Sequence, residues 1–313
     1  MTADNAPFPW TASGNAAFDE ARAGGIIDSA VGFPKTKEEM YETYAFIRNQ
    51  VRDGQSKDGE GDLKFPAGYM FKNVPEWNDG ELDDPVTWML MEMERHGLSH
   101  CVIGVSNDDE RRAVREHPDK FSVAIGCDPN DGMEQLRNID RAYEEWGSQL
   151  KLVGAFPSGL YPQVPLNDKK FYPVYMKCVE LDLPFCSTVG VPGPRIPMMP
   201  QLVEYLDEVC WFFPELTFVT RHGCEPWTAL AAKLLLKWPN LYYSTTAFAP
   251  KYYPTDIINF ANTRGADKVM FAGYFPAGLS YDRQFTEMPH VPFRDHVWPK
   301  FLRENSQKVF KLP

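Results

Sequence analysis

Short apolar segments recur along this 313-residue chain, and most of them are followed by a stretch with helical character. Alternation of this kind predicts parallel strands joined by crossover helices, and eight such units favour a closed barrel over an open sheet. We therefore predict one α/β domain over residues 1–313, a single (β/α)₈ TIM barrel with its core at about 25–312, because a barrel needs roughly 250 residues. The eight strand candidates are 25–28, 101–105, 121–125, 150–155, 183–187, 216–220, 241–244 and 268–272.

Helices are expected between most of these strands, near residues 131–147, 168–182, 200–213, 227–237 and 255–264. A further helix should begin at Asp84 and Pro85 and end at Gly97. Asp is a favoured residue at the N-cap and Pro is favoured in the first helical turn.

Two stretches interrupt the alternation: an insertion at 33–83 after the first strand, and a long Pro-rich loop at 275–294 after the eighth. In a barrel, the loops that follow the strands build the active-site face. The aromatic-rich insertion is therefore either a lid over an apolar ligand, an extra packing element or a subunit contact, as in a homodimer. The sequence does not decide among these three.

The net charge of −11 argues against nucleic acid and anionic membranes as partners, because both require a basic face, and leaves a small molecule as the expected ligand. No apolar run approaches the roughly 20 residues that span a bilayer, and residues 1–16 lack the features of a secretory signal. The six cysteines are scattered and predict buried free thiols in a reducing, cytoplasmic compartment. Phosphate-cradling and dinucleotide-binding motifs are absent, so no organic cofactor is expected.

The segments at four predicted strand ends carry a more specific pattern. They are 27–33, 183–190, 221–227 and 271–278. In this order they resemble the amidohydrolase-related family that includes aminocarboxymuconate-semialdehyde decarboxylase and 2-pyrone-4,6-dicarboxylate lactonase, over roughly 25–312. The resemblance implies a barrel enzyme that acts on a small cyclic or aromatic, carboxylated substrate.

The chain departs from that family where the family holds its metal. The family usually carries His-x-His after the first strand, a His after the fifth and an Asp after the eighth, and these places hold Ala30, Gly32, Thr188 and Tyr274. Ala and Gly offer no side-chain lone pair, and neutral Thr and Tyr are poor zinc ligands. The sequence therefore predicts no catalytic metal, and His222 is the one polar group of the usual set that remains.

Three residues are candidates for catalysis. His222 matches a family histidine that moves protons, and its unperturbed pKa near 6.5 suits a general acid or base, although it could instead be bonded to the backbone. Tyr274 could donate a hydrogen bond to an oxyanion or fill the space that the lost ligands leave. Asp28 matches a family residue just below the metal site and is either a general base or a support for the first-strand turn.

Further residues are expected to contact substrate. Thr188 and Thr246 should point into the barrel mouth, and Trp227 lies in the loop after the sixth strand. Arg195 is either a carboxylate clamp, since its planar fork matches that anion, or part of a surface salt bridge.

The charged residues near these candidates are expected to be structural. Arg221 should face the helices in a structural ion pair if His222 faces the lumen, and Glu225 should cap the following helix rather than orient His222. Asp282 and Arg283 are expected to pair within their loop.

The leading hypothesis is a metal-independent enzyme that cleaves its substrate by hydrolysis or decarboxylation, with His222 as general acid or base. The alternative is a catalytically inactive barrel that serves as a ligand-binding or partner subunit. An enzyme should show a lined pocket with His222 reachable beside a second polar group, whereas an inactive barrel should show His222 buried under Tyr274.

Overall fold

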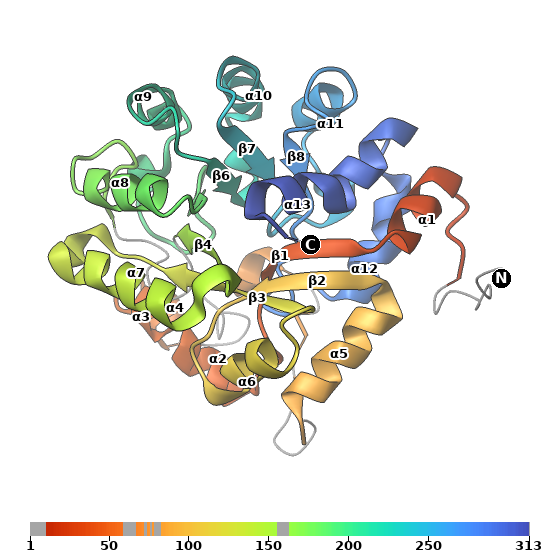
Figure 1. Cartoon of the computed structure of the whole chain (residues 1–313), viewed down its shortest axis with the longest axis horizontal. Coiled ribbons are helices and arrows are strands. Elements are labelled where there is room, and N and C mark those ends of the chain that lie inside the picture. Colours follow the sequence, from red (N-terminus) through yellow and green to blue (C-terminus); the bar gives the residue numbers. More distant parts are fainter. Residues whose placement is uncertain are drawn as a thin grey trace.

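The computed structural model describes residues 11–58, 67–71, 74–75, 77, 83–154 and 163–312. In this part of the chain eight strands form one parallel sheet in the order β1 to β8 (Figure 1), which confirms the predicted (β/α)₈ barrel. The strands are β1 (Ile26–Val31), β2 (Leu98–Ile103), β3 (Phe121–Gly126), β4 (Leu150–Gly154), β5 (Phe185–Thr188), β6 (Phe218–Arg221), β7 (Leu241–Ser244) and β8 (Val269–Met270).

The eighth strand is shorter than predicted, and loop backbone closes the barrel beside it. The amide of Tyr274 donates to the carbonyl of Ala30 at 3.0 Å, and the amide of Gly32 donates to the carbonyl of Phe275 at 2.7 Å. The loop after β8 is thereby fixed to β1. Position 155, the last residue of the fourth predicted strand, lies outside the described residues.

The helices form an outer layer around the strands (Figure 1). The predicted N-cap is confirmed for α5, where Asp84 accepts from the amide of Val86, and the helix ends at Gly97 with a φ of 78°. The helices outside the insertion and the eighth-strand loop are α1 (Ala16–Ala23), α5 (Pro85–His96), α6 (Asp108–Glu116), α7 (Met133–Trp146), α8 (Tyr172–Glu180), α9 (Tyr205–Phe212), α10 (Thr228–Lys237), α11 (Thr255–Ala261) and α13 (Asn305–Phe310).

The long loop predicted after the eighth strand contains a helix, α12 (Tyr281–Glu287). Its N-cap is Ser280, whose hydroxyl oxygen accepts from the amide of Arg283 at 3.3 Å. The predicted long loop therefore includes a short helix that the sequence analysis did not anticipate, because a serine cap starts a helix inside the Pro-rich stretch.

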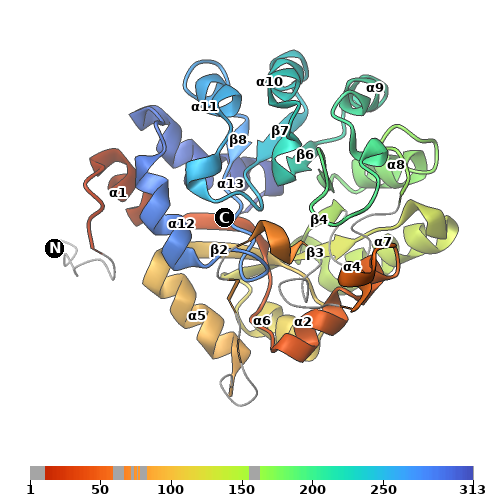
Figure 2. The same cartoon turned by 180° about the vertical axis from the view of Figure 1, so that it is seen from behind.

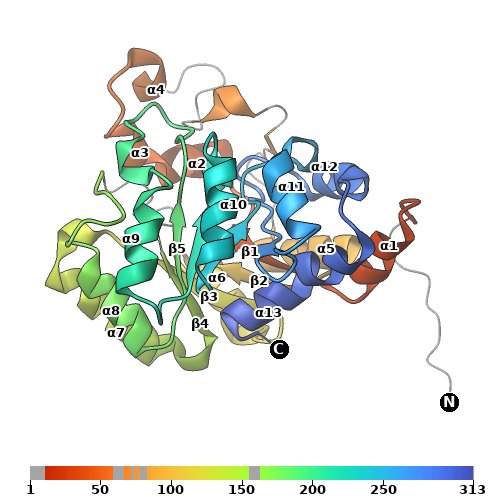
Figure 3. The same ribbon diagram turned by 90° about the horizontal axis from the view of Figure 1, so that it is seen from above.

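One end of the barrel is closed by the end of the chain. Each strand contributes one inward-facing residue to a layer that also includes Val309, Phe310 and Leu312. Figure 3 shows α13 and the C-terminus at this end, which holds the amino ends of the strands. Any substrate must therefore enter from the opposite end.

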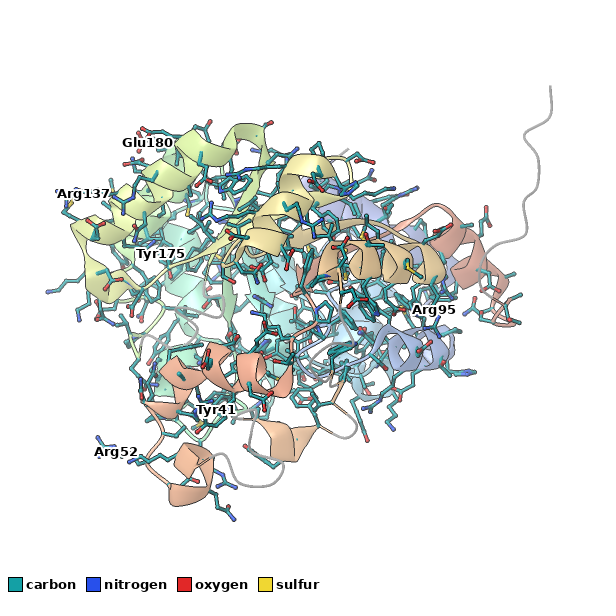
Figure 4. The ribbon with its side chains drawn as sticks, turned by 90° about the horizontal axis from the view of Figure 1, so that it is seen from below. Tyr41, Arg52, Arg95, Arg137, Tyr175 and Glu180 are labelled. Carbon is teal, nitrogen blue, oxygen red and sulfur yellow. The ribbon has the colours of Figure 1, made fainter. Side chains whose placement is uncertain are left out.

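The insertion after β1 covers that opposite end (Figures 2 and 3). Figure 4 shows Tyr41 and Arg52 on the insertion, whereas Arg137 and Glu180 lie at the outer edge of α7 and α8. The buried apolar side chains of the insertion form a cluster that packs against Phe71 and Tyr274. The cluster consists of Met40, Tyr44, Ile47, Val51 and Ala67. The described elements of the insertion are α2 (Lys37–Thr43), α3 (Ala45–Arg48), α4 (Gly54–Asp58) and the 3₁₀ turn η2 (Gly68–Met70).

The six cysteines are buried free thiols, as predicted. Among the described residues, none of the helices has both the length and the apolar character needed to cross a bilayer.

Candidate active site

A cavity of about 340 Å³ lies at the carboxyl ends of the strands. Its walls come from the insertion and from the loops after β5, β6, β7 and β8, as expected for the functional face of a barrel. Apolar and aromatic side chains dominate the lining. The lining residues are Ile47, Ala67, Met70, Phe71, Val191, Gly193, Pro194, His222, Glu225, Ala247, Phe248, Ala249, Tyr252, Tyr274, Leu279 and Arg283.

His222 and Tyr274 meet in this cavity. Their ring centroids are 5.1 Å apart, and the ring planes are nearly perpendicular at 80°. Both side chains are partly exposed, and both line the cavity. The tyrosine therefore does not bury the histidine, which is the arrangement expected of an enzyme rather than of an inactive barrel.

The backbone around the cavity adopts conformations that L-residues rarely take. His222, Ala247 and Tyr274 have φ values of 63°, 71° and 65°. Gly223 follows His222 with a φ of 82°, and a Cβ there would lie 2.3 Å from the ring of Phe248. Such conformations cost roughly 1–3 kcal/mol each and cluster at functional sites, so their concentration here supports a functional cavity.

The two rings carry complementary hydrogen-bonding groups at neutral pH. Burial, and to a lesser extent the positive charge of Arg221, lower the pKa of His222 to about 3. Burial raises the pKa of Tyr274 to about 12, against the opposing effects of Arg221 and of a hydrogen bond with Tyr44. The free protein thus presents a neutral imidazole beside a protonated phenol. The pKa of His222 therefore lies below the ordinary value used in the sequence analysis, because the folded chain withdraws most of the imidazole from solvent.

Arg221 faces the barrel lumen, which contradicts the predicted outward orientation. It lies two residues after the inward-facing Val219, and its register partner in β5 is Thr188. Its positive charge contributes to the low pKa of His222 and opposes the rise that burial causes in the pKa of Asp28 and Tyr274. A buried guanidinium therefore lies close to both rings of the cavity.

Asp28 lies beneath the cavity rather than in its wall, and its carboxylate is completely buried. Its Oδ1 accepts from the amides of Ala30 at 3.0 Å and Gly273 at 2.8 Å, and its Oδ2 accepts from the hydroxyl of Tyr281 at 3.1 Å. Burial raises the pKa of Asp28 although these hydrogen bonds oppose the shift. The carboxylate thus connects β1 to the loop after β8 and to α12, which favours the supporting role.

Thr188, Thr246 and Trp227 are not among the lining residues of the cavity. Thr188 is 2% exposed, and its hydroxyl has no hydrogen-bond partner in the described part of the chain. The hydroxyl of Thr246 is 2.8 Å from that of Ser244. Trp227 packs against the hydrophobic core at the start of α10. Their assignment to substrate binding stays a prediction.

Arg195 joins the insertion to the loop after β5. Its guanidinium donates to Asp53 at 2.7 Å and to Gln55 at 3.1 Å, and it lies 5.2 Å from the ring of Tyr69. The hydroxyl of Tyr69 donates to the carbonyl of Gly193 at 2.5 Å. The geometry favours the salt-bridge alternative for Arg195, and these contacts hold the insertion over the cavity.

Two charged residues of the lining were expected to be structural. Glu225 does not cap α10, whose first turn has no side-chain cap, and burial raises the pKa of its carboxyl group. Asp282 and Arg283 do not pair with each other: Asp282 accepts from Arg95 at 2.9 Å, and Arg283 donates to Glu287 at 3.1 Å. Glu225 follows the sixth strand and Arg283 follows the eighth, and these positions were the available signal that both residues could face the site.

The residues at the expected metal position do not suit a divalent cation. Ala30 and Gly32 bring no donor atom, and Thr188 and Tyr274 bring only neutral hydroxyls. Arg221 adds a positive charge in the same lumen. Across the described residues, no group of three His, Cys, Asp or Glu side chains could hold a metal ion. The donor set therefore does not fit the metal that the family resemblance implies.

Comparison with known proteins gives one family. The model of the family described as "Amidohydrolase" matches residues 67–312, which is most of the chain and excludes β1. No match was found among curated proteins.

Solved barrel structures are similar along nearly the whole chain. An uncharacterised TIM-barrel protein from Bordetella bronchiseptica is 20% identical with a TM-score of 0.64, and the match covers 92% of this chain and 99% of that one. The 5-carboxyvanillate decarboxylase of Novosphingobium aromaticivorans, solved with manganese, is 17% identical with a TM-score of 0.62, covering 92% and 96%. The 2,6-dihydroxybenzoate decarboxylase of Rhizobium is 14% identical with a TM-score of 0.58, covering 92% and 99%. At these identities the likeness establishes the fold.

Proposed function

The chain belongs to the amidohydrolase family, and on this premise we propose that it is a metal-independent enzyme that cleaves a small aromatic or cyclic carboxylic acid. His222 acts as general acid or base, and Tyr274 donates a hydrogen bond to the reacting group. Decarboxylation is the favoured reaction, and hydrolysis is the second candidate. The observation that carries the proposal is the pair of His222 and Tyr274 in the wall of a largely apolar cavity.

The chemistry of the cavity favours decarboxylation. A carboxylate that loses its water in an apolar site moves closer in energy to neutral carbon dioxide, so the departure of carbon dioxide becomes easier. The solved decarboxylases named above act on aromatic carboxylates, which points to the same class of substrate for this cavity. Hydrolysis would instead require the site to position and activate a water molecule.

Proton delivery can come from His222 once the substrate is bound. An anionic substrate beside the imidazole stabilises its protonated form and raises the pKa of His222 from about 3. The imidazolium then transfers its proton to the ring carbon that bears the carboxylate. The bond from that carbon to the carboxyl group breaks, carbon dioxide leaves, and the bonding electrons return to the ring.

Tyr274 has a separate role in this scheme. Its phenol stays protonated at neutral pH, since its pKa is about 12, and it can donate to a substrate oxygen on which negative charge develops. No step requires a metal, in keeping with the lack of metal-donor side chains at Ala30 and Gly32 and the neutral hydroxyl at Thr188.

The test is turnover by purified protein together with elemental analysis. Hydroxybenzoic acids and lactones are screened against the wild type, His222→Asn and the control His290→Asn, which changes an exposed histidine. We expect turnover of an aromatic acid by the wild type and the control, and a loss of about 10²–10⁴-fold in His222→Asn. Stoichiometric zinc or manganese would overturn metal independence. Binding without turnover would favour the inactive, ligand-binding barrel.

A further inference from the structure

Arg283 is the one arginine or lysine among the described residues that line the cavity. It lies in α12, and its side chain is 27% exposed. The other charged lining residue is Glu225, and within the described chain Arg283 pairs with Glu287 rather than with Glu225. The cavity therefore contains a cation that its own acidic residue does not neutralise.

The contacts of Arg283 leave part of its guanidinium available. Its Nε donates to Oε1 of Glu287 at 3.1 Å, while its two terminal nitrogens have no hydrogen-bond partner in the described part of the chain. Anchoring through Nε holds the planar group in place and leaves the edge formed by the two Nη atoms for a ligand. A planar carboxylate matches an edge of this kind through two parallel hydrogen bonds.

The carboxylate that pairs with Arg283 is shared with a second cation, Lys251. Glu287 accepts from the amide of Lys251 at 3.4 Å, and its carboxylate lies 3.7 Å from the ammonium group of Lys251. Two cations thus share one carboxylate, so Glu287 does not neutralise Arg283 by itself. Asp282, the neighbouring acid, lies 2.9 Å from Arg95, which also pairs with Glu92, and it makes no ion pair with Arg283 among the described residues.

The reacting carboxylate of a decarboxylation substrate is a poor partner for such an arginine. That group loses its charge as carbon dioxide forms, so an ion pair to it stabilises the ground state more than the transition state and slows the reaction. A group that stays ionised throughout gains binding energy without this penalty. Arg283 is therefore better suited to bind a second anionic group of the substrate that does not react.

We propose that Arg283 binds a non-reacting carboxylate of the substrate, and that the cavity selects aromatic dicarboxylates over monocarboxylates. This inference rests on the proposed function for the identity of the reacting group. Arg283 orients the ring so that the other carboxylate remains within the apolar part of the cavity. The residue thus determines specificity and takes no part in bond breaking.

Binding of inert probes tests the proposal. Isothermal titration calorimetry compares isophthalate, benzoate and benzamide on the wild type, Arg283→Gln, Arg283→Lys and Arg264→Gln. The last variant removes an equal charge from an exposed position beyond α11, away from the cavity lining. We expect the wild type and Arg264→Gln to bind isophthalate about 10- to 100-fold more tightly than benzoate. Arg283→Gln should lose this preference while keeping its affinity for benzoate, and Arg283→Lys should retain part of it.

The proposal is overturned if Arg283→Gln keeps the preference for isophthalate, or if the wild type shows none. Circular dichroism confirms that each variant is folded. Turnover separates this inference from the proposed function. If the wild type turns over aromatic acids and Arg283→Gln keeps the preference for isophthalate, the role of Arg283 in binding a second carboxylate is refuted. The proposed enzymatic function then still stands. If the preference depends on Arg283 but no aromatic acid is turned over, the proposed enzymatic function is refuted. The role of Arg283 in binding a carboxylate is then supported.

Discussion

The ring of His222 meets the ring of Tyr274 edge to face, with centroids 5.1 Å apart and an angle of 80° between the planes. The two residues come from the loops after β6 and β8, and each is held at a positive φ. The contact fixes a proton acceptor beside a proton donor in the same wall. At this position, where the family resemblance implies a carboxylate, the chain carries a phenol that can donate a hydrogen bond.

Replacing Tyr274 by Phe should separate its chemical role from its packing role. The variant keeps the ring that stacks on Phe71 at 6.1 Å and loses only the hydroxyl group. If that hydroxyl stabilises developing charge, kcat should fall by about 10²-fold, while the melting temperature changes little. Steady-state kinetics measure the effect, with Tyr252→Phe as the control because Tyr252 also lines the cavity and is 60% exposed. An unchanged kcat would mean that Tyr274 only fills space.

Replacing Arg221 by Met should raise the pKa of His222. The guanidinium is the second cause of the depressed value, after burial, so its removal shifts the pKa upwards without restoring the ordinary value. A histidine-detected NMR titration measures the shift, and Arg264→Met controls for the loss of a distant charge. If the pKa of His222 does not move, Arg221 and His222 do not share the lumen.

The low pKa of His222 makes the stability of the protein depend on pH. Between about pH 6.5 and pH 3 the unfolded chain protonates this histidine and the native chain does not, so stability falls as the pH falls. The contribution is at most about 1.4 kcal/mol per pH unit, because one proton is involved. Urea denaturation at pH 7, 6 and 5 should show a shallower loss for His222→Asn than for the wild type. The control His290→Asn should follow the wild type, and equal slopes for all three proteins would contradict the burial of His222.

The sequence was sufficient to predict the barrel from local signals, and the family resemblance was sufficient to place His222 at the mouth of the barrel. Strand–helix alternation gave the eight units, and Asp84 and Gly97 marked the ends of α5 through their capping chemistry. Arg221 was placed on the wrong face by strict strand alternation. The strand ends at Arg221, and His222 takes a φ of 63°, so the alternation does not continue across this pair.

Contacts between distant segments could not be predicted from the sequence. Arg195 pairs with Asp53, which lies 142 positions earlier in the insertion, and no local pattern links the two. Arg283 was assigned to a loop ion pair because the short helix α12 was not anticipated. The folded chain instead pairs Asp282 with α5 and presents Arg283 to the cavity.

Replacing Asp28 by Asn should destabilise the fold more than it impairs the chemistry. The amide cannot accept all three hydrogen bonds in the same geometry, and a buried donor is left unsatisfied at a cost of about 1–3 kcal/mol. Urea denaturation should show this loss, while kcat of the folded fraction stays within about tenfold of the wild type. A collapse of kcat with unchanged stability would instead identify Asp28 as the general base.

A double-mutant cycle on Arg195 and Asp53 distinguishes a lid contact from a carboxylate clamp. If the pair holds the insertion over the cavity, Arg195→Ala and Asp53→Asn should raise KM by the same factor, and the double variant should raise it no further, because either change breaks the same contact. The increase should be equal for a carboxylate substrate and for its neutral amide analogue, and the insertion should be cleaved faster by a protease in both variants. A clamp predicts a different pattern, in which only Arg195→Ala weakens binding and only carboxylated ligands are affected. Arg264→Ala serves as the control, since it removes an exposed arginine beyond α11 that does not line the cavity.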